Sequence, residues 1–247
     1  METPTVKLQA FLAQHGYGSR RGLDAMIAEG RITVDGSTAT VGQRVIGTES
    51  IAIDGRTIAA APVKPRYFLI NKPVGIVSTT SDELNRKTVL SLVPSIQERV
   101  YPVGRLDVES EGLMLLTNDG ELANKMTHPR FGFIKTYRVT VEGLPSEKAI
   151  DHLERGVRLK EGYTNAATIT NLSQKGDFST FEISISQGWN QQVRRMCDRV
   201  GYPVVRLVRI AFGPFILDSL REKKCIELSK EDVEEKLAKM MTTTAFG

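Results

Sequence analysis

The sequence predicts an α+β protein, in which a small N-terminal unit of helices and hairpins precedes a larger domain with a largely antiparallel mixed sheet. Apolar residues repeat with helical spacing early in the chain, and from residue 67 strand and helix signals mix without a steady βαβ rhythm. Residues 59–65 have no period and contain two prolines, which is typical of a linker. We therefore expect one domain at 1–60, a linker at 61–66 and a second domain at 67–247.

The N-terminal unit opens with two apolar stripes of helical spacing, at residues 8–12 and 23–27. Ser19 is a suitable N-cap for the second helix, and a glycine follows its last turn. Short alternating segments come next, with Asp-Gly pairs at 35–36 and 54–55 that are typical of hairpin turns. This order predicts two short helices followed by short paired strands.

The second domain starts with a strand. Further segments have the apolar runs or the alternation of strands, and four others have helical spacing. The expected strands are 67–70, 113–116, 137–141 and 181–185, and the expected helices are about 119–127, 146–155, 191–200 and 229–241. Ser229 and Asp232 resemble a capping box at the start of the last helix.

Composition excludes several classes of protein. The chain has 247 residues, of which 40% are hydrophobic and 25% charged, as in ordinary globular proteins. It has no apolar run of the roughly 18 residues that a membrane helix requires, and its start lacks the pattern of a signal peptide. Its two cysteines form neither a disulfide framework nor a zinc spacing. We therefore expect a cytoplasmic protein without a membrane partner.

Positive charge is concentrated late in the chain. The formal net charge is only +4, but residues 187–210 hold five arginines and one aspartate. A local basic patch is typical of a protein that meets phosphate. A solvated helix face is an equally good interpretation of this pattern on charge alone.

Residues 104–120 carry the strongest chemical signal. Gly-Arg-Leu-Asp is followed, after four residues, by Gly-Leu-Met-Leu-Leu-Thr-Asn-Asp-Gly. An arginine close to Asp107 favours the ionised carboxylate, which in a cleft acts as a nucleophile or a base. From these residues alone, a turn with a hydrogen-bonded aspartate is the more common interpretation. A glycosidase-like pair of Asp107 with Glu109 or Glu111 is another, although carboxylates this close in a loop usually face solvent.

This stretch resembles the catalytic motif of the RsuA-type RNA pseudouridine synthases. Asn-Lys-Pro-Val-Gly at 71–75 is similar to the opening motif of that family, and Gln-Gly-Trp-Asn-Gln-Gln-Val-Arg-Arg-Met at 187–196 is similar to its closing motif. The resemblance extends from about Tyr67 to Leu228. It implies a pseudouridine synthase fold and an enzyme that isomerises chosen uridines in ribosomal RNA after flipping them out of a helix.

The resemblance also implies roles for individual residues. Asp107 matches the essential aspartate, Tyr137 matches a tyrosine that stacks on the target base, and Arg194 matches the basic residue that pairs with the aspartate. Arg105 is expected to support the site. RNA contacts in this domain are expected from Lys72, Asn190, Gln192 and Arg195. Without the resemblance, Tyr137 is most simply a core residue of an alternating strand, and the role of Trp189 stays open.

The N-terminal unit resembles a small RNA-binding domain first described in a small-subunit ribosomal protein. The resemblance rests on the first apolar stripe, Gly-Ser-Arg-Arg at 18–21, Gly-Arg at 30–31 and Val-Asp-Gly at 34–36. It implies phosphate contacts from Ser19, Arg20, Arg21 and Arg31. A helix face with ordinary solvated arginines is the alternative.

Together these features predict a ribosomal RNA pseudouridine synthase that acts as a monomer, with ribosomal RNA or a pre-ribosomal particle as partner and with no metal or other cofactor. The stretch 187–197 favours 23S over 16S ribosomal RNA. A catalytically inactive RNA-binding assembly protein is the alternative, although Asp107, Tyr137 and Arg194 argue against it. A nucleic-acid hydrolase is a third possibility, but the sequence lacks a histidine pair or a metal cluster.

Overall fold

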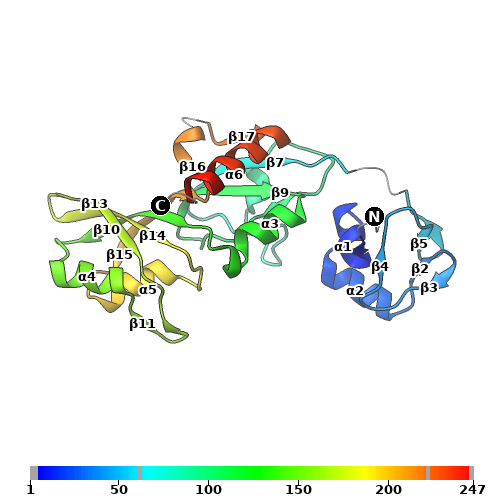
Figure 1. Ribbon diagram of the computed structural model, residues 1–247, viewed down its shortest axis with the longest axis horizontal. Coiled ribbons are helices and arrows are strands. Elements are labelled where there is room, and N and C mark those ends of the chain that lie inside the picture. The colour runs from blue at the N-terminus through cyan, green and yellow to red at the C-terminus, as the bar shows by residue number, and fades with distance from the viewer. Residues whose placement is uncertain (1–4, 60–62, 221–222, 245–247) are drawn as a thin grey trace. The chain divides into compact units, whose positions relative to one another are not determined.

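A computed structural model describes residues 5–59, 63–220 and 223–244 (Figure 1). The chain divides into two compact units. One holds the chain up to Pro65 together with Ser95–Arg99, and the other holds Arg66–Pro94 and the chain from Val100 onward. The expected linker at 61–66 lies partly outside the described residues. The sequence placed Ser95–Arg99 in the second domain, whereas the structure groups this segment with the first unit.

The small unit has two helices and two small sheets. Strand β1 pairs with β4, and the other four strands form a sheet in the order β3-β2-β5-β6. The elements are β1 (Val6–Lys7), α1 (Leu8–Gln14), α2 (Arg20–Ala28), β2 (Ile32–Val34), β3 (Ser37–Thr38), β4 (Arg44–Val45), β5 (Ile51–Ile53) and β6 (Arg56–Thr57). Both predicted helical stripes are buried in one core, which includes Leu8, Leu12, Leu23 and Ile27.

Local signals in the small unit have the predicted structural effect. The Ser19 hydroxyl accepts a hydrogen bond from the Gly22 amide at 3.1 Å and so caps α2. Asp35 and Asp54 each have a positive φ, and each is followed by a glycine with a positive φ. This geometry is that of a two-residue hairpin turn, and it joins β2 to β3 and β5 to β6.

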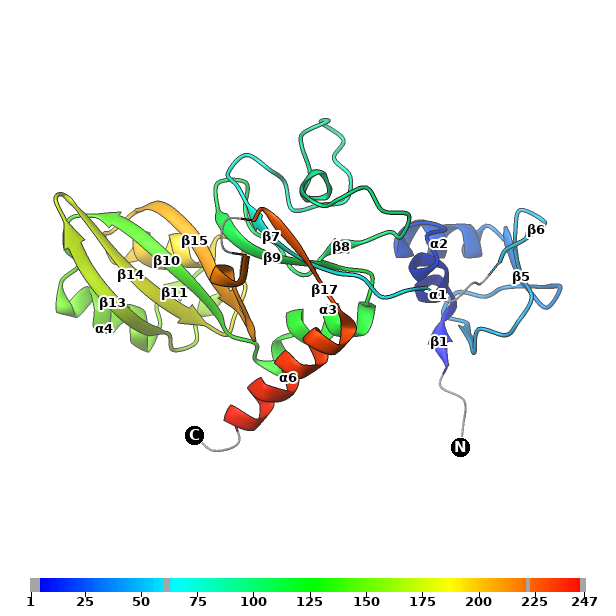
Figure 2. The same ribbon diagram turned by 90° about the horizontal axis from the view of Figure 1, so that it is seen from above.

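The second unit is built on a nine-stranded sheet in the order β13-β14-β10-β15-β9-β7-β17, with β16 beside β15 and β8 beside β9 (Figures 1 and 2). Every pair is antiparallel except β15 with β9. The largely antiparallel mixed sheet that the sequence predicted is therefore confirmed. The strands are β7 (Tyr67–Lys72), β8 (Tyr101–Pro102), β9 (Glu111–Thr117), β10 (Lys135–Glu142), β13 (Thr168–Lys175), β14 (Phe178–Ile185), β15 (Val204–Phe212), β16 (Phe215–Ile216) and β17 (Cys225–Leu228).

Four helices accompany this sheet, and a separate short hairpin lies outside it. The helices are α3 (Gly120–Thr127), α4 (Glu147–Arg155), α5 (Gln192–Arg199) and α6 (Lys230–Thr244), the hairpin is β11 (Arg158–Leu159) with β12 (Gly162–Tyr163), and the 3-10 helices are η1 (Val89–Leu92), η2 (Pro129–Phe131) and η3 (Leu217–Leu220). Residues of α3 and α6 share a buried core with β7, β9 and the end of β15. The predicted capping box of α6 is present, because Ser229 and Asp232 exchange bonds of 3.1 and 3.0 Å.

The parallel pair β9–β15 requires a glycine at its start. Gly112 has a φ of +107° and lies opposite Arg209. A Cβ atom on Gly112 would lie 2.3 Å from the Arg209 carbonyl oxygen. The glycine of the 104–120 motif therefore allows β9 to approach β15, and this approach places the loop before β9 beside Arg209.

Candidate active site

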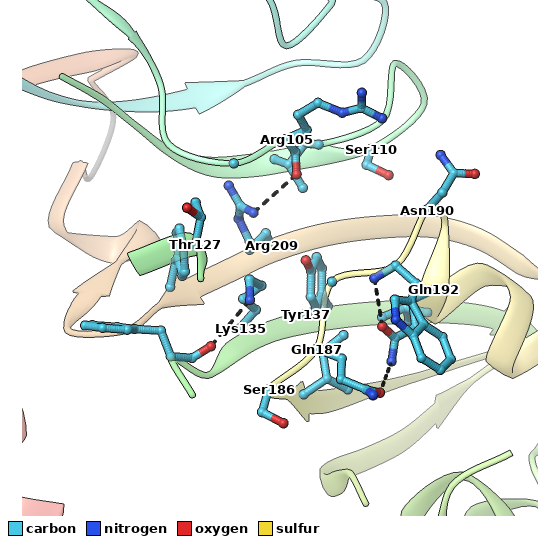
Figure 3. Close-up of a pocket in the computed structure, with 18 of the residues that line it drawn as sticks. Arg105, Ser110, Thr127, Lys135, Tyr137, Ser186, Gln187, Asn190, Gln192 and Arg209 are labelled. Carbon is cyan, nitrogen blue, oxygen red and sulfur yellow. Dashed lines mark hydrogen bonds between the residues drawn. The ribbon is translucent and has the colours of Figure 1, made fainter. Parts of the chain in front are cut away.

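A cavity of about 480 Å³ opens in the second unit (Figure 3). Its walls come from the loop before β9, the end of α3, strands β10 and β15, and the segment between β14 and α5. Among the described residues that line it, Asp107 is the only carboxylate. Arg105, Tyr137 and Asn190 also line it, as the sequence predicted for a shared site.

Six consecutive backbone carbonyls hold the loop that carries Asp107. Each carbonyl from residue 105 to residue 110 accepts a hydrogen bond from another part of the second unit or from within the loop. Among side chains, Arg209 donates to the Arg105 carbonyl at 3.5 Å, Ser78 to the Leu106 carbonyl at 2.5 Å and Arg194 to the Glu109 carbonyl at 3.0 Å. Lys72 donates to the carbonyls of Asp107 and Ser110 at 3.1 and 2.8 Å. The backbone amides of Gly75 and Ser110 donate to the carbonyls of Val108 and Asp107 at 2.8 and 3.0 Å. A loop tied at every residue holds its aspartate in one position, which is the preorganisation that catalysis requires.

Lys72 lies under this loop and does not reach solvent. Its side chain is fully buried, and its ammonium group donates to the carbonyls of Pro73, Asp107 and Ser110. Burial lowers the pKa of Lys72 to about 8, and the nearby Asp107 carboxylate opposes that shift. All three N–H donors of the ammonium group are used inside the protein, so the predicted RNA contact of Lys72 requires that one of these bonds open.

Arg194 also holds the loop backbone. Its guanidinium donates to the carbonyls of Val204 at 3.1 Å and Glu109 at 3.0 Å. The predicted ion pair with the Asp107 carboxylate is absent from the described part of the chain. The helix α5 that carries Arg194 begins after Gln191, which has a left-handed backbone and no side-chain hydrogen bond to the helix.

Three side chains form the opposite wall. Tyr137 lies on β10 opposite Arg209 on β15, and Lys135 lies two residues before Tyr137 on the same face of the strand. Figure 3 shows the three side chains next to one another. Burial lowers the pKa of Arg209, with the Tyr137 hydroxyl opposing the shift, and burial together with Arg209 lowers the pKa of Lys135 to about 8.

The segment between β14 and α5 is shaped by Gln192. Its side-chain oxygen accepts from the Trp189 amide at 3.0 Å, and its side-chain nitrogen donates to Gln187 at 3.2 Å (Figure 3). Gln192 is 4% exposed. Gln192 therefore fixes this segment, and both Gln192 and Trp189 line the cavity.

Comparisons with known proteins decide the family. The RNA pseudouridylate synthase family matches residues 66–199, and the S4 domain matches residues 6–48. The chain belongs to the RNA pseudouridylate synthase family. It is an RNA pseudouridine synthase, an isomerase, with an S4 domain of the kind that binds RNA. The family and the activity predicted from the sequence are therefore confirmed.

Individual relatives agree. The Bacillus subtilis protein "Ribosomal large subunit pseudouridine synthase B" is 38% identical over 231 residues, which cover 92% of this chain and 94% of that protein. An "Uncharacterized RNA pseudouridine synthase" of Aquifex aeolicus is 35% identical and covers 93% of both chains. A solved structure, "Crystal structure of pseudouridylate synthase", superimposes with a TM-score of 0.65 at 26% identity and covers 94% of this chain and 99% of that one.

The arginines of residues 187–210 do not form one basic surface on the synthase. Arg195 pairs with Glu161 at 2.9 Å, and Arg206 pairs with Glu111 at 2.9 Å. Arg194 and Arg209 donate to backbone carbonyls, and Arg209 is only 1% exposed. This leaves Arg199 as the only one of the five that is exposed without a partner among the described residues. The predicted RNA contact of Arg195 therefore requires that its ion pair open.

The arginines of the small unit that were predicted to contact phosphate differ in whether they already have partners inside the protein. Arg31 donates twice to Asp54, at 2.8 and 2.7 Å, and once to Glu29 at 3.3 Å. Arg20 and Arg21, in the first turn of α2, are exposed and have no side-chain partner in the described part of the chain. The structure therefore leaves Arg20 and Arg21 free for RNA and gives Arg31 an internal role.

Sequence reasoning missed two residues of the cavity wall. They are Arg209, which the sequence analysis includes only in the basic stretch 187–210, and Lys135, to which it gives no role. Both lie on strands among apolar residues, and a cation on the buried face of a strand is the signal that identifies them. No helix in the described ranges is long and apolar enough to span a membrane, and no cluster of three metal-binding side chains occurs in the same ranges.

Proposed function

We propose that this synthase isomerises uridine in the RNA of the large ribosomal subunit, with Asp107 as the catalytic carboxylate. The observation that carries the choice of Asp107 is its position as the only carboxylate among the described residues that line the cavity. The choice of the large subunit is supported by the name and the coverage of the Bacillus subtilis relative. It also agrees with the 23S preference that the motif at 187–197 predicted.

The reaction separates uracil from its ribose and joins the two again. The bond between C1′ and N1 breaks with both electrons staying on the base. The Asp107 carboxylate either attacks C1′ or removes a proton from the sugar. The base then turns and bonds to C1′ through C5, while the Asp107–C1′ bond breaks or, on the other route, the sugar regains its proton. C5 then loses its proton and N1 gains one. Both routes require an ionised aspartate at a fixed position, and the six bonded carbonyls of its loop supply that position.

The target uridine reaches the cavity by leaving its helix. A cavity of about 480 Å³ is within the usual range for small-molecule sites of roughly 300–1,000 Å³. Tyr137 provides an aromatic face there, on which the flipped base stacks. Asn190 and Arg105 are exposed at the cavity and are the residues that we assign to the RNA strand around the target.

We further propose that the region up to residue 60 is an RNA-binding domain that adds affinity through Arg20 and Arg21. The match to the S4 domain and the exposure of both arginines support this role. The partner is then ribosomal RNA or a pre-ribosomal particle in the cytoplasm, and the synthase acts as a monomer. The catalytic domain comprises residues 67–247.

The decisive experiment compares Asp107→Asn with Glu109→Gln. An amide of nearly the same shape can neither attack the sugar nor accept its proton, so the Asp107 variant should form no pseudouridine. Glu109 is exposed and does not line the cavity, so its variant should keep the parent rate. Pseudouridine would be mapped in 23S and 16S ribosomal RNA from a deletion strain complemented with each variant. Substantial activity of Asp107→Asn, or a missing modification in 16S RNA alone, would contradict the proposal.

A further inference from the structure

Two cations of the cavity wall lack a counter-ion. The Lys135 ammonium has one hydrogen-bond partner among the described residues, the Phe133 carbonyl, at 3.4 Å. Arg209 donates through Nε to the Leu113 carbonyl at 2.8 Å and through one Nη to the Arg105 carbonyl at 3.5 Å. Its other Nη atom is buried without a partner. No carboxylate of the described chain forms an ion pair with either cation.

The two cations converge on one aromatic ring. Nζ of Lys135 lies 5.3 Å from the centroid of the Phe212 ring, and Cζ of Arg209 lies 5.0 Å from it. Lys135 is the register partner of Phe212, and Arg209 is the register partner of Tyr137. Figure 3 shows both cations beside Tyr137, so a base stacked on the Tyr137 ring would have this pair of cations at its edge.

The charge balance of the cavity is incomplete in the absence of substrate. A buried cation costs free energy unless an anion or several acceptors compensate it. The Asp107 carboxylate acts on Lys72. Burial and the positive charge of Arg209 both lower the pKa of Lys135, and burial lowers the pKa of Arg209. An anion that arrives with the substrate would complete the site.

We propose that Lys135, supported by Arg209, donates a hydrogen bond to a carbonyl oxygen of the target uracil and stabilises the negative charge that the base acquires when the C1′–N1 bond breaks. This inference rests on the proposed function. Lys135 is the group that touches the base. Arg209 is a positioning residue that holds the Arg105 carbonyl and adds positive potential beneath Tyr137.

The step balances without another reactant. The electron pair of the broken bond moves onto uracil and spreads over N1 and the two carbonyl oxygens. The ammonium group only donates a hydrogen bond, so no proton leaves Lys135. The charge disappears when C5 bonds to C1′. C5 then loses its proton and N1, which no longer carries the ribose, gains one, so the base stays neutral. A donor aimed at charge that exists only during the reaction speeds the reaction more than it tightens binding.

A phosphate is the competing anion, and depth argues against it. Arg209 is 1% exposed and lies beside the tyrosine on which the base stacks. The phosphates of a flipped nucleotide stay joined to the RNA chain outside the cavity, where exposed Arg105 is available. The two anions can be distinguished by experiment. A phosphate contact contributes to RNA affinity and to its salt dependence, whereas a contact with the uracil anion contributes mainly to the rate.

The test measures single-turnover rates on RNA with uridine or 5-fluorouridine at the target. Fluorine at C5 lowers the proton affinity of the departing uracil anion, so this anion needs less stabilisation by the protein. Lys135→Met should slow the loss of target uridine by about a hundredfold, as the loss of one oxyanion donor does. The defect on 5-fluorouridine, followed as disappearance of the starting nucleoside, should be clearly smaller. Lys135→Arg should recover part of the rate, and RNA affinity should not change.

The controls separate the possible failures. Lys148 is exposed on α4, and Lys148→Met should behave like the parent enzyme. If Lys135→Met is unfolded by circular dichroism, Lys135→Gln replaces it. Three results for the Lys135 variant would each overturn the inference. They are an equal rate defect on uridine and 5-fluorouridine, an unchanged rate, and weaker RNA binding with a salt slope lower by about one, as for a lost phosphate contact. A parent enzyme that forms no pseudouridine would instead refute the proposed function.

Discussion

The small unit and the synthase domain use cations in opposite ways. Arg20 and Arg21 of the small unit are exposed and have no partner within the described chain. Lys72 and Arg209 of the synthase domain are buried and donate to backbone carbonyls. An exposed cation is available to phosphate, whereas a buried cation shapes the site. Net charge therefore says little about which arginines and lysines meet RNA.

The largest expected effect comes from Lys72→Met. Each buried carbonyl that loses its donor costs about 1–3 kcal/mol. Loss of the buried charge offsets part of this, so the unfolding free energy should fall by about 2–4 kcal/mol. The Asp107 loop would also lose two of its ties, and activity should fall by more than about a hundredfold. Urea unfolding and pseudouridine assays test both effects, with Lys148→Met as control. A stable and active variant would show that Lys72 does not hold the loop.

A smaller effect concerns pH. The pKa values of Lys72 and Lys135 are lowered from 10.5 to about 8, chiefly by burial. Between about pH 8 and pH 10.5, these two lysines are protonated in the unfolded chain but largely deprotonated in the folded protein. The unfolding free energy should therefore rise with pH, by up to about 1.4 kcal/mol per pH unit for each lysine. Below pH 8 both states are protonated, and this contribution to the slope vanishes.

Lys135→Met isolates one of these two contributions. Urea unfolding between pH 8 and pH 10 should show a shallower rise for this variant than for the parent enzyme. The Lys148→Met variant should keep the parent slope, because Lys148 is exposed. Identical slopes in all three proteins would mean that Lys135 titrates as it does in the unfolded chain.

The smallest effect is expected in the small unit. Arg20→Ala and Arg21→Ala should each weaken RNA binding and lower the salt slope by roughly 0.7–0.9 if each arginine meets one phosphate. Arg31→Ala is the matched control, since Arg31 is held by Asp54 and Glu29. Affinity measured against salt concentration tests this set. Equal behaviour of all three variants and the parent would mean that Arg20 and Arg21 are only solvated.

The fold was largely predictable because its signals are local. Two Asp-Gly pairs specify hairpins, Ser19 and Ser229 cap helices, and the alternation around Tyr137 specifies a strand. The motif at 104–120 located the cavity for a similar reason, since it is contiguous in sequence.

The partners of the charged residues were not predictable. Arg194 reaches a carbonyl 85 residues away, and Arg209 reaches one 96 residues away. Such contacts depend on how β15 and the loop before β9 come together, which sequence periodicity does not specify. The resemblance pairs Arg194 with the aspartate, whereas its hydrogen bonds in the structure go to the backbone carbonyls of Glu109 and Val204.

The contrast between cations that hold the site and cations that bind RNA is tested most directly by measuring reaction rate and RNA affinity on the same variants. Arg194→Ala leaves the Glu109 and Val204 carbonyls without their donor and frees the loop, so the single-turnover rate at saturating RNA should fall by about a hundredfold while affinity stays the same. The double variant Arg20→Ala with Arg21→Ala should lose affinity and keep the saturating rate. The opposite pattern, with weaker RNA binding and an unchanged rate for Arg194→Ala, would contradict the account that cations bonded to backbone carbonyls build the site and exposed, unpaired cations bind RNA.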